Sequence, residues 1–319
     1  MNQSPGSDSE DLTSSTEDII YEQNLPEQDD DEEPAQSQHK EKIKALRSKI
    51  KEDRNNNFVH LERNDDAFLL LFLRARYFRV PASYQLLCNY KEFRAKNASV
   101  FQNLTAWRLH HVIEDGFPCV LPYNNQNGAK MMVIFAGGWD TETYGSVDIL
   151  KAFILSMERL IEDKDVQRNG IIIIADFSGW TTTHTSQLSV SFIRQVCCML
   201  QDHYPARFLG FHFVNEPWYV RAVLTLLKPF IETKIWKRIH VHGNNMASLH
   251  DHCDQEKLPA EFGGNKPSVN REYWARVLLD SERSSRDHVY GENPFKCLLD
   301  SNQSEYDWGT EEIPHVITT

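Results

Sequence analysis

The sequence lacks any run of about 18 uncharged apolar residues, the shortest stretch expected for a membrane-spanning helix. Its first residues, MNQSPGSDSEDL, have neither the basic start nor the apolar core of a secretory signal peptide. These two absences predict a cytosolic protein.

Cysteine is scarce, and its spacing shows no pattern. The six cysteines among 319 residues include no CxxC pair, so we expect neither a zinc site nor a disulfide framework. In a reducing compartment such cysteines are usually small core residues or unreactive thiols. They are Cys88, Cys119, Cys197, Cys198, Cys253 and Cys297.

Common catalytic motifs are also missing. There is no G-x-S-x-G nucleophile turn, no phosphate-binding loop, no G-x-G-x-x-G after a strand and no H-E-x-x-H pair. Asp176 and Ser178 follow a predicted strand and could be catalytic, but such residues more often cap the next turn. The sequence therefore predicts a protein that is not an enzyme. A lipid or ester hydrolase that uses Ser178 is the alternative.

Histidines cluster towards the end of the chain without a recognised metal-ligand spacing. His240 and His242 share one face of a predicted strand, and His250, His252 and Cys253 follow shortly after. A metal site is one interpretation of this cluster, and ordinary histidines are the one we favour. We expect no metal and no cofactor.

Basic residues are absent from residues 1–39, which contain twelve acids and therefore account for the whole formal net charge of −12. Residues 281–319 are also acidic, so the part between them, residues 40–280, carries +5. We expect both ends to be flexible acidic tails, because neither can bury enough apolar surface to offset the entropy of ordering. The weakly basic middle predicts no nucleic-acid binding, but a local basic patch could meet anionic lipid.

The middle of the chain divides into two parts. Residues 40–115 contain helical patterns typical of a small bundle. Residues 116–280 alternate short β-type runs with segments of helical length, which predicts an α/β domain with a mixed, largely parallel sheet flanked by helices. Four runs are expected to be strands, and GIIIIADF is expected to be central because it is apolar almost throughout. They are MMVIFA at 131–136, GIIIIADF at 170–177, FLGFHFV at 208–214 and RIHVHG at 238–243.

The segment 217–238 is expected to be one amphipathic helix. Val223, Leu227 and Phe230 belong to its apolar stripe, and the same face continues to Lys234 and Arg238. It could be a core-packed helix whose last turn carries cations that suit the helix dipole. It could also be a gate over an apolar cavity that turns towards a membrane, with Pro229 allowing it to bend.

Several ordered motifs resemble one protein family. The stretches YPARFLGFHFVNEPWY, KPFIETKIWKRIHVHGNN and LPAEFGG are similar to the C-terminal half of the CRAL-TRIO lipid-binding family, and DDAFLLLFLRARYF is similar to its helical N-terminal region. The resemblance covers about residues 40–280. It is strongest to the clavesin branch, near the tocopherol and retinaldehyde carriers, through EDGFP, SVDIL, HFVNEPWY, HGNNMASLH and YWARVLLD.

The resemblance implies a fold, two sites and a role. The fold is the CRAL-TRIO fold, in which a mobile gate helix covers an apolar pocket. By similarity, the gate residues are Val223, Leu227 and Phe230, and the phosphoinositide-binding residues are Arg76, Arg207, Lys234, Lys237 and Arg238. The positions implied to line the pocket are Leu150, Phe153, Met157, Ile171, Ala175, Leu188, Val196, Met199, Leu200 and Phe211.

By the same resemblance, the role is that of a lipid-binding or lipid-transfer protein, peripheral on endosomal or trans-Golgi membranes. It implies a bound hydrophobic ligand, phosphatidylinositol bisphosphate in its 3,5 form as the membrane lipid, and the clathrin machinery as a partner. The alternative is a cytosolic carrier of a retinoid or tocopherol-like isoprenoid. For each pocket position, ordinary core packing is the simpler interpretation.

Overall fold

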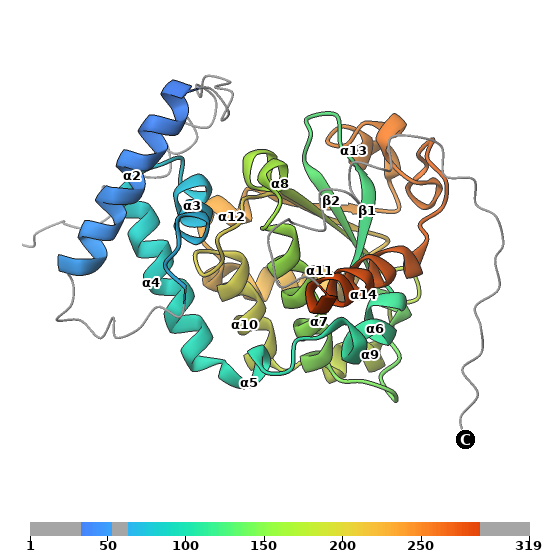
Figure 1. The fold of residues 1–319 in the computed structure, drawn as a ribbon. Helices are drawn as coiled ribbons and strands as arrows, with labels where there is room; N and C mark the ends of the chain where they lie inside the picture. Colours follow the sequence, from blue (N-terminus) through green and yellow to red (C-terminus); the bar gives the residue numbers. More distant parts are fainter. Residues whose placement is uncertain (1–32, 53–62, 288–319) are drawn as a thin grey trace, which may run out of the picture.

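The computed structural model describes residues 33–52 and 63–287; for residues 33–36 and 285–287 it describes the backbone alone. A group of helices at one side of the molecule adjoins an α/β part built on one sheet (Figure 1). The helices that precede the sheet in the sequence are α2 Glu33–Glu52, α3 Asp66–Ala75, α4 Val80–Lys96, α5 Ala98–Phe101 and α6 Ala106–Glu114.

The sheet has five strands in the order β1-β2-β3-β4-β5, and only the β1–β2 pair is antiparallel. The strands are β1 Cys119–Asn124, β2 Lys130–Phe135, β3 Ile171–Asp176, β4 Phe208–Val214 and β5 Ile239–Gly243. The mixed α/β fold and the central position of β3 are therefore confirmed. β1 was not predicted, because its sequence CVLPYN contains Pro122, which lacks a backbone donor and is tolerated at a sheet edge.

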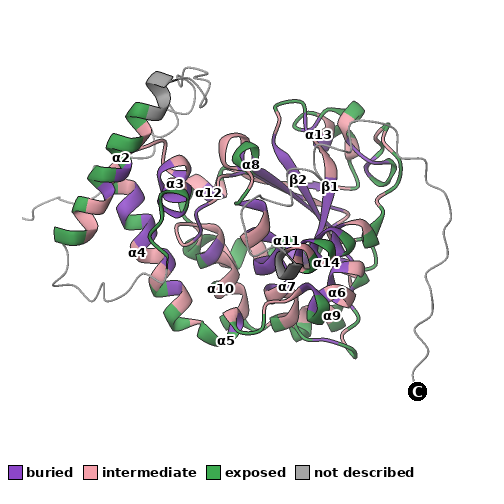
Figure 2. Ribbon diagram, viewed as in Figure 1, coloured by how far each residue is buried: buried purple, intermediate pink, exposed green. Residues whose placement is uncertain are grey.

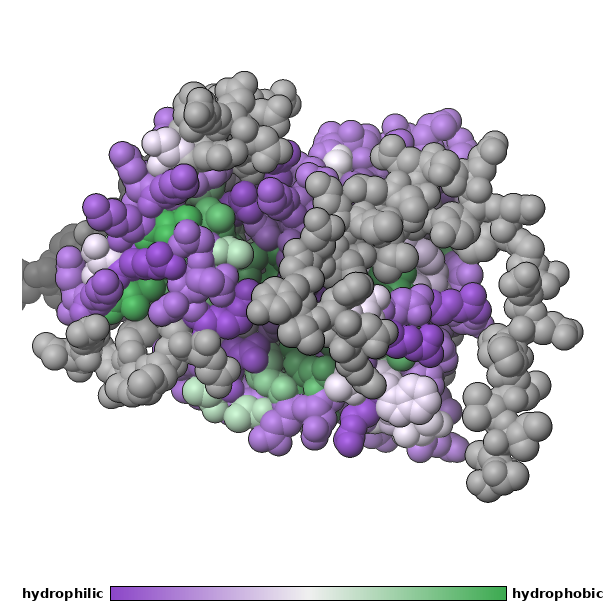
Figure 3. All heavy atoms as spheres, in the orientation of Figure 1, coloured by the Kyte–Doolittle hydropathy of each residue, from purple (hydrophilic) through white to green (hydrophobic). Residues whose placement is uncertain are grey.

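Both faces of the sheet are covered, and its strands are mostly buried (Figure 2). Every residue of β3 is buried; Ile171 and Ile173 face one apolar cluster, and Ile172 and Ile174 face the other. The face drawn in Figure 3 is mainly hydrophilic, and hydrophobic residues show in separate areas. The remaining α-helices are α7 Ser146–Leu160, α8 Lys164–Asn169, α9 Thr182–Gln187, α10 Val190–Leu200, α11 Trp218–Leu227, α12 Thr233–Trp236, α13 Met246–His250 and α14 Arg271–Asp287. The 3-10 turns are η1 Ala136–Gly138, η2 Lys228–Phe230, η3 Gln255–Lys257 and η4 Ala260–Phe262.

Helices enter both of the segments that we expected to be flexible tails. α2 begins at Glu33, because a helix anchored by buried Ile43 and Leu46 extends at one hydrogen bond per added residue. α14 continues past residue 280 to Asp287, and Ser281 is fully buried. Residues 1–32 and 288–319, including Cys297, lie outside the described residues.

The last helix joins the two parts of the protein. α14 packs on α6 and β1. Trp274 is fully buried in α14, and its indole nitrogen donates to Ser156 Oγ of α7 at 2.8 Å. The Glu282 carboxylate accepts a hydrogen bond from the backbone nitrogen of Ala106, the first residue of α6. A carboxylate at this helix end satisfies a free donor and complements the dipole.

The expectation of one continuous helix over 217–238 is wrong. α11 ends at Leu227, η2 follows, and the chain is extended at Ile231 before α12 starts at Thr233. Pro229 explains the break, because it cannot donate a backbone hydrogen bond and its ring clashes with the preceding turn. The apolar stripe of α11 therefore does not continue along one helix to Lys234 and Arg238. Within the described ranges, no helix is both long and apolar enough to cross a membrane.

Candidate functional site

A basic hollow of about 250 Å³ lies where the end of α3, the loop before β4 and the α12 region meet. Six of its lining residues are cations and one is an acid, so its surface is strongly positive. The lining residues are Ala75, Arg76, Tyr77, Arg79, Leu200, Gln201, Asp202, Ala206, Arg207, Phe208, Lys234, Ile235, Lys237 and Arg238.

All five cations that the family resemblance implied lie in this hollow. They come from three separate segments of the chain, so the fold, and not the local sequence, brings them together. They are Arg76, Arg207, Lys234, Lys237 and Arg238. Lys237 is exposed, whereas the other four are half-buried.

The backbone after α3 turns sharply at the rim of the basic hollow. Tyr77 and Phe78 both have left-handed backbone angles, with φ of 50° and 57°. This conformation is costly for residues other than glycine, so the surrounding packing must hold it. It allows Arg76, Tyr77 and Arg79 to line the same hollow, whereas in a regular helix Tyr77 would point about 100° away from Arg76.

On the other side, Gly170 fixes the approach to β4. Its φ is 78°, and a Cβ at this position would lie 2.8 Å from the carbonyl oxygen of Arg207. The same carbonyl accepts a hydrogen bond of 2.8 Å from the backbone nitrogen of Ile171. Only glycine allows this close approach, which sets the start of β4 and with it the position of Arg207.

Among the described residues, Asp202 is the only acid that lines the basic hollow. Its Oδ1 lies 2.5 Å from Nη2 of Arg76 and 2.9 Å from Nζ of Lys234. Burial by itself would raise the pKa of this carboxyl, but Arg76 and Lys234 hold it below its ordinary value. Asp202 is therefore a charged counter-ion that fixes two of the cations, and the described lining residues of the hollow include five more cations than acids.

Two arginines are oriented by neighbouring groups. The guanidinium of Arg207 lies over the Tyr77 ring, 5.0 Å from its centroid, and its Nε is buried with no hydrogen-bond partner among the described residues. Arg238 donates from Nη1 to the carbonyl oxygen of Phe208 at 2.6 Å. The Tyr77 ring thus orients the Arg207 guanidinium and leaves its positive charge in place.

Tyr77, Arg79 and Asp202 are among the residues of the basic hollow that the sequence did not reveal. The available signal was the run RARYFR, in which Arg79 follows Arg76 by three residues. This spacing alone does not show that both cations line the hollow, because the chain leaves the helix between them at Tyr77 and Phe78.

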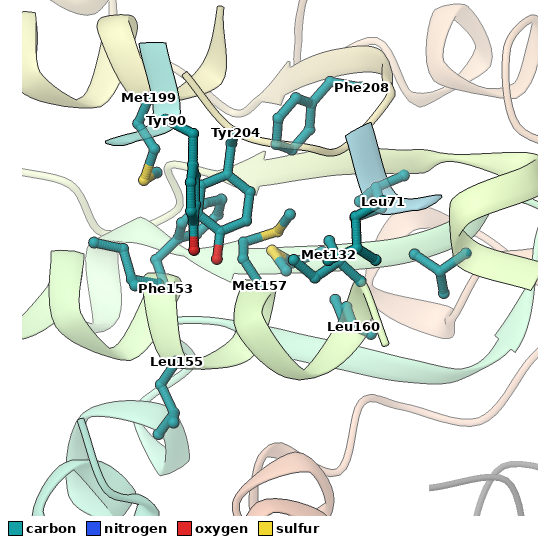
Figure 4. Packing of buried hydrophobic residues seen from close by; sticks show 14 of the residues in the cluster. Leu71, Tyr90, Met132, Phe153, Leu155, Met157, Leu160, Met199, Tyr204 and Phe208 are labelled. Atoms are coloured by element: carbon teal, nitrogen blue, oxygen red, sulfur yellow. The ribbon is translucent and has the colours of Figure 1, made fainter. Parts of the chain in front are cut away.

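The ten residues implied to line a lipid pocket lie on α7, β3, α10 and β4 and at the end of α9. Seven are buried, and Leu188, Val196 and Leu200 are half-buried against the same core. In Figure 4 the side chains of Phe153, Met157 and Met199 lie close together among other buried residues. Nine of the ten positions, all except Ala175, belong to the main apolar cluster or pack against it, and Leu200 also lines the basic hollow.

The three implied gate residues do not lie on one helix. Val223 and Leu227 are half-buried on α11, whereas Phe230 lies in η2 with half of its surface exposed. The Arg194 guanidinium of α10 lies 4.6 Å from the centroid of the Phe230 ring. Gln201 Oε1 accepts a hydrogen bond from the backbone nitrogen of Glu232 at 2.5 Å. Together these contacts tie the segment after α11 to α10.

Asp176 and Ser178 form a turn. Asp176 Oδ1 accepts hydrogen bonds from the backbone nitrogen and the hydroxyl of Ser178, at 2.9 and 2.7 Å, and from Asn215 Nδ2 at 2.8 Å. The Asp176 carboxylate thus accepts both from the hydroxyl and from the backbone nitrogen of Ser178, which is the geometry of a capped turn.

Four histidine rings stack on the sheet face opposite α7. Nδ1 of His212 lies 3.0 Å from Nε2 of His242, and the centroids of His240 and His252 are 4.0 Å apart. Burial and the neighbouring rings lower the pKa of His212 to about 3 and that of His242 to about 4. His250 and Cys253 lie apart from the stack, His250 bonding to the Phe262 carbonyl. Across residues 33–52 and 63–287, no group of three or more histidine, cysteine or acidic side chains is placed to hold a metal ion.

The sequence comparisons identify the class of protein. The CRAL/TRIO domain model matches residues 114–264, which include the whole sheet, α10 and α11. Clavesin-2 of Rattus norvegicus and of Homo sapiens are each 45% identical to this chain over 222 residues, which is 69% of this chain and 68% of theirs. The chain belongs to the CRAL/TRIO family, and its clavesin homologues are lipid-binding or lipid-transfer proteins, not enzymes.

Within this family, the chain is similar to the clavesins in particular. Clavesin-1 of Xenopus laevis is also 45% identical, over 219 residues that make up 68% of this chain and 66% of that protein. The family resemblance predicted from the sequence is thus confirmed, and the chain is a non-enzymatic lipid-binding or lipid-transfer protein. Among solved structures, the crystal structure of Sfh5 aligns with a TM-score of 0.48 and 16% identity, over 81% of this chain and all of that one.

Proposed function

We propose that this lipid-binding protein docks on phosphoinositide-containing membranes through the basic hollow. The observation that carries the proposal is the gathering of six cations against one acid around about 250 Å³. Each cation near an anionic membrane surface contributes roughly 1 kcal/mol, and guanidinium groups bind phosphate oxygens in pairs. Several phosphates on one headgroup would engage these cations better than one phosphate, so a phosphatidylinositol bisphosphate is the lipid class that fits.

We also propose that a hydrophobic ligand is held beneath α11, between α7, α10 and the sheet. The support is the uniformly apolar character of the ten positions in this region and the half-buried face of α11. Mass spectrometry of organic extracts of the purified protein tests this part. A stoichiometric phospholipid supports a phospholipid carrier or sensor, and a stoichiometric retinoid or tocopherol-like molecule supports the isoprenoid alternative. An extract that contains no lipid at all would contradict the ligand proposal.

The proposed place of action is the cytosolic surface of endosomal or trans-Golgi membranes, with phosphatidylinositol 3,5-bisphosphate as the lipid and the clathrin machinery as a partner. The similarity to the clavesins supports this choice. A panel of vesicles that each contain one phosphoinositide isomer tests the lipid. Equal binding to every isomer would overturn the preference for the 3,5 form and leave docking itself intact.

The sharpest test of docking is Lys237→Glu, because Lys237 lines the hollow and is exposed, so its loss perturbs packing least. The variant should sediment with bisphosphate vesicles about tenfold less well than the wild type, as two units of charge are removed near the surface. Lys257→Glu in η3 is the matched control, because it changes the charge equally outside the hollow lining. An equal loss of vesicle binding in both variants would show that only the net charge of the protein matters. It would contradict the proposal that the basic hollow is the docking site.

The double variant Lys234→Ala with Arg238→Ala should abolish vesicle binding. It should also lower the melting temperature, because Lys234 pairs with Asp202 and Arg238 bonds to the Phe208 carbonyl. Lys237→Glu therefore remains the variant that separates binding from stability. Undiminished binding by the double variant would contradict the assignment of the hollow.

A further inference from the structure

The chain contains a second group of charges that complements the basic hollow. Residues 1–39 hold twelve acids and no Lys or Arg, and six of these acids fall within the seven residues EQDDDEE at 27–33. The hollow carries five cations more than acids. A cluster of cations this dense attracts anions, and the densest run of carboxylates in the sequence belongs to the same molecule.

The acidic run enters the described structure close to the rim of the hollow. α2 begins at Glu33, and the His39 ring stacks on the Phe78 ring with the centroids 4.3 Å apart and the planes parallel. Phe78 lies between Tyr77 and Arg79 in the sequence, and both of those residues line the hollow. Along a helix, the backbone of Glu33 is about 9 Å from that of His39. Glu33, where the described helix begins, therefore lies within about two helical turns of a contact that adjoins the hollow.

We propose that residues 27–32, with the sequence EQDDDE, are an intramolecular ligand of the basic hollow and compete there with the phosphoinositide headgroup. This inference rests on the proposed docking function and adds its regulation. A segment tethered so close to the site has a local concentration of the order of millimolar, which is sufficient for weak carboxylate contacts to compete. A phosphate carries more charge and more acceptor oxygens than a carboxylate, so a membrane rich in bisphosphate displaces the segment.

The consequence is a threshold for docking. Membranes with little phosphoinositide do not overcome the internal competitor, whereas membranes with enough of it do. Salt weakens the binding of both the acidic segment and the headgroup. The difference in vesicle affinity between the wild type and a variant with a neutralised acidic run should therefore shrink as ionic strength rises.

The first experiment neutralises the acidic run in the full-length chain. The variant is Glu27→Gln, Asp29→Asn, Asp30→Asn, Asp31→Asn and Glu32→Gln. Its matched control makes five equivalent changes at the other end of the chain. The control is Glu292→Gln, Asp300→Asn, Glu305→Gln, Asp307→Asn and Glu311→Gln. Both raise the net charge by five units, so only the position of the charges differs.

We expect the N-terminal variant to bind phosphatidylcholine vesicles containing bisphosphate at least about threefold more tightly than the wild type at low salt, and the C-terminal control to change less than half as much. Equal gains in both variants, or no gain in the N-terminal one, would overturn the competition. If neither the wild type nor the N-terminal variant distinguishes bisphosphate vesicles from neutral ones, the docking function itself fails, which is a separate result.

The second experiment needs no lipid. A carbodiimide joins carboxylates to amines that are in contact, and peptide mass spectrometry locates the new amide. We expect cross-links from residues 27–32 to Lys234 or Lys237, lost in the presence of inositol hexakisphosphate. A cross-link of Lys234 to Asp202 or Glu232, which lie 2.9 and 3.2 Å away, is the internal positive control. If this control link forms without any link to residues 27–32, the inference is wrong.

Discussion

The ammonium nitrogen of Lys234 lies 2.9 Å from Oδ1 of Asp202, so the basic hollow contains its own counter-ion. The same carboxylate also pairs with Arg76. Such an arrangement holds the cations in place before any ligand arrives, and it offsets part of the positive charge that a phosphate would meet.

Asp202→Asn should therefore move stability and binding in opposite directions. We expect the free energy of unfolding to fall by about 1 kcal/mol, because two half-buried ion pairs are weakened. Binding to bisphosphate vesicles should increase about threefold, because the hollow gains one unit of positive charge. Urea denaturation and vesicle sedimentation measure the two effects, and a variant that loses both stability and binding would show that Asp202 acts only through folding.

The lowered pKa of Asp202 also predicts how the free energy of unfolding changes with pH. The folded protein holds this pKa below 3.8, the ordinary value for an aspartate. The ion pairs therefore contribute their full stability at a pH above the pKa of Asp202 in the unfolded chain. That contribution is lost as the pH falls through the lower pKa of Asp202 in the folded protein. In Asp202→Asn, the free energy of unfolding should accordingly depend less on pH below about 4. If the free energy of unfolding of this variant depends on pH below about 4 as it does in the wild type, Asp202 is not the group responsible.

The histidine stack should destabilise the protein at mildly acidic pH. Lowered pKa values for His212, His240 and His242 mean that the folded state holds the rings neutral, so the unfolded state binds more protons. The charges of Glu216 and Asp251 oppose this shift at His242 but do not reverse it. The free energy of unfolding should fall as the pH drops from about 6.5 towards 4.

The control for the histidine stack is His240→Gln with His252→Gln, which removes the closest ring pair in it. The remaining rings then have fewer cationic neighbours, so the decline in stability between pH 6.5 and 4 should become shallower. Urea denaturation at several pH values provides the measurement. A slope equal to that of the wild type would assign the pH dependence to other groups.

Trp274→Ala should cost about 3–5 kcal/mol of stability, because it removes a fully buried ring that joins α14 to α7. Trp274→Phe should cost less, since it keeps most of the volume and loses the hydrogen bond to Ser156 Oγ. Thermal or urea denaturation distinguishes the two. Similar losses from both variants would mean that the hydrogen bond outweighs the packing.

Arg194→Ala tests whether the contacts after α11 restrain the proposed gate. Arg194 lies over the half-exposed Phe230 ring, a contact worth about 0.5–1 kcal/mol. Its loss should speed the transfer of a pyrene-labelled phosphatidylcholine between vesicles by about two- to fivefold with little change in melting temperature. Arg276→Ala is the matched control, because its partner Glu272 lies on α14, away from α11. Equal transfer rates in the wild type and Arg194→Ala would contradict a restraint at this contact.

The sequence predicted the features that depend on local patterns. β3 and β4 were located closely because an apolar run bounded by turn residues leaves few alternatives. β1 was missed because Pro122 is compatible with an edge strand only, and the sequence does not say which strand lies at the edge. The break after Leu227 was missed because apolar spacing on both sides of Pro229 matched a single helix.

For the basic hollow too, the sequence predicted some residues and missed those whose position depends on the fold. The family resemblance supplied five cations, and the structure places them together. The family resemblance could not supply Arg79 or Tyr77, because their position depends on two left-handed residues after α3. It could not supply Asp202 either, because an acid in a basic site has no signature in the sequence.

The position of α14 has a consequence for how the protein is made. α6 and β1 emerge from the ribosome well before residue 271, yet the helix that covers them and caps the first turn of α6 is among the last described segments to be synthesised. Until then their apolar faces remain open to solvent or to chaperones. A premature stop between Gly243 and Trp274 should therefore yield a chain that aggregates, even though it contains every described strand of the sheet and every cation of the hollow.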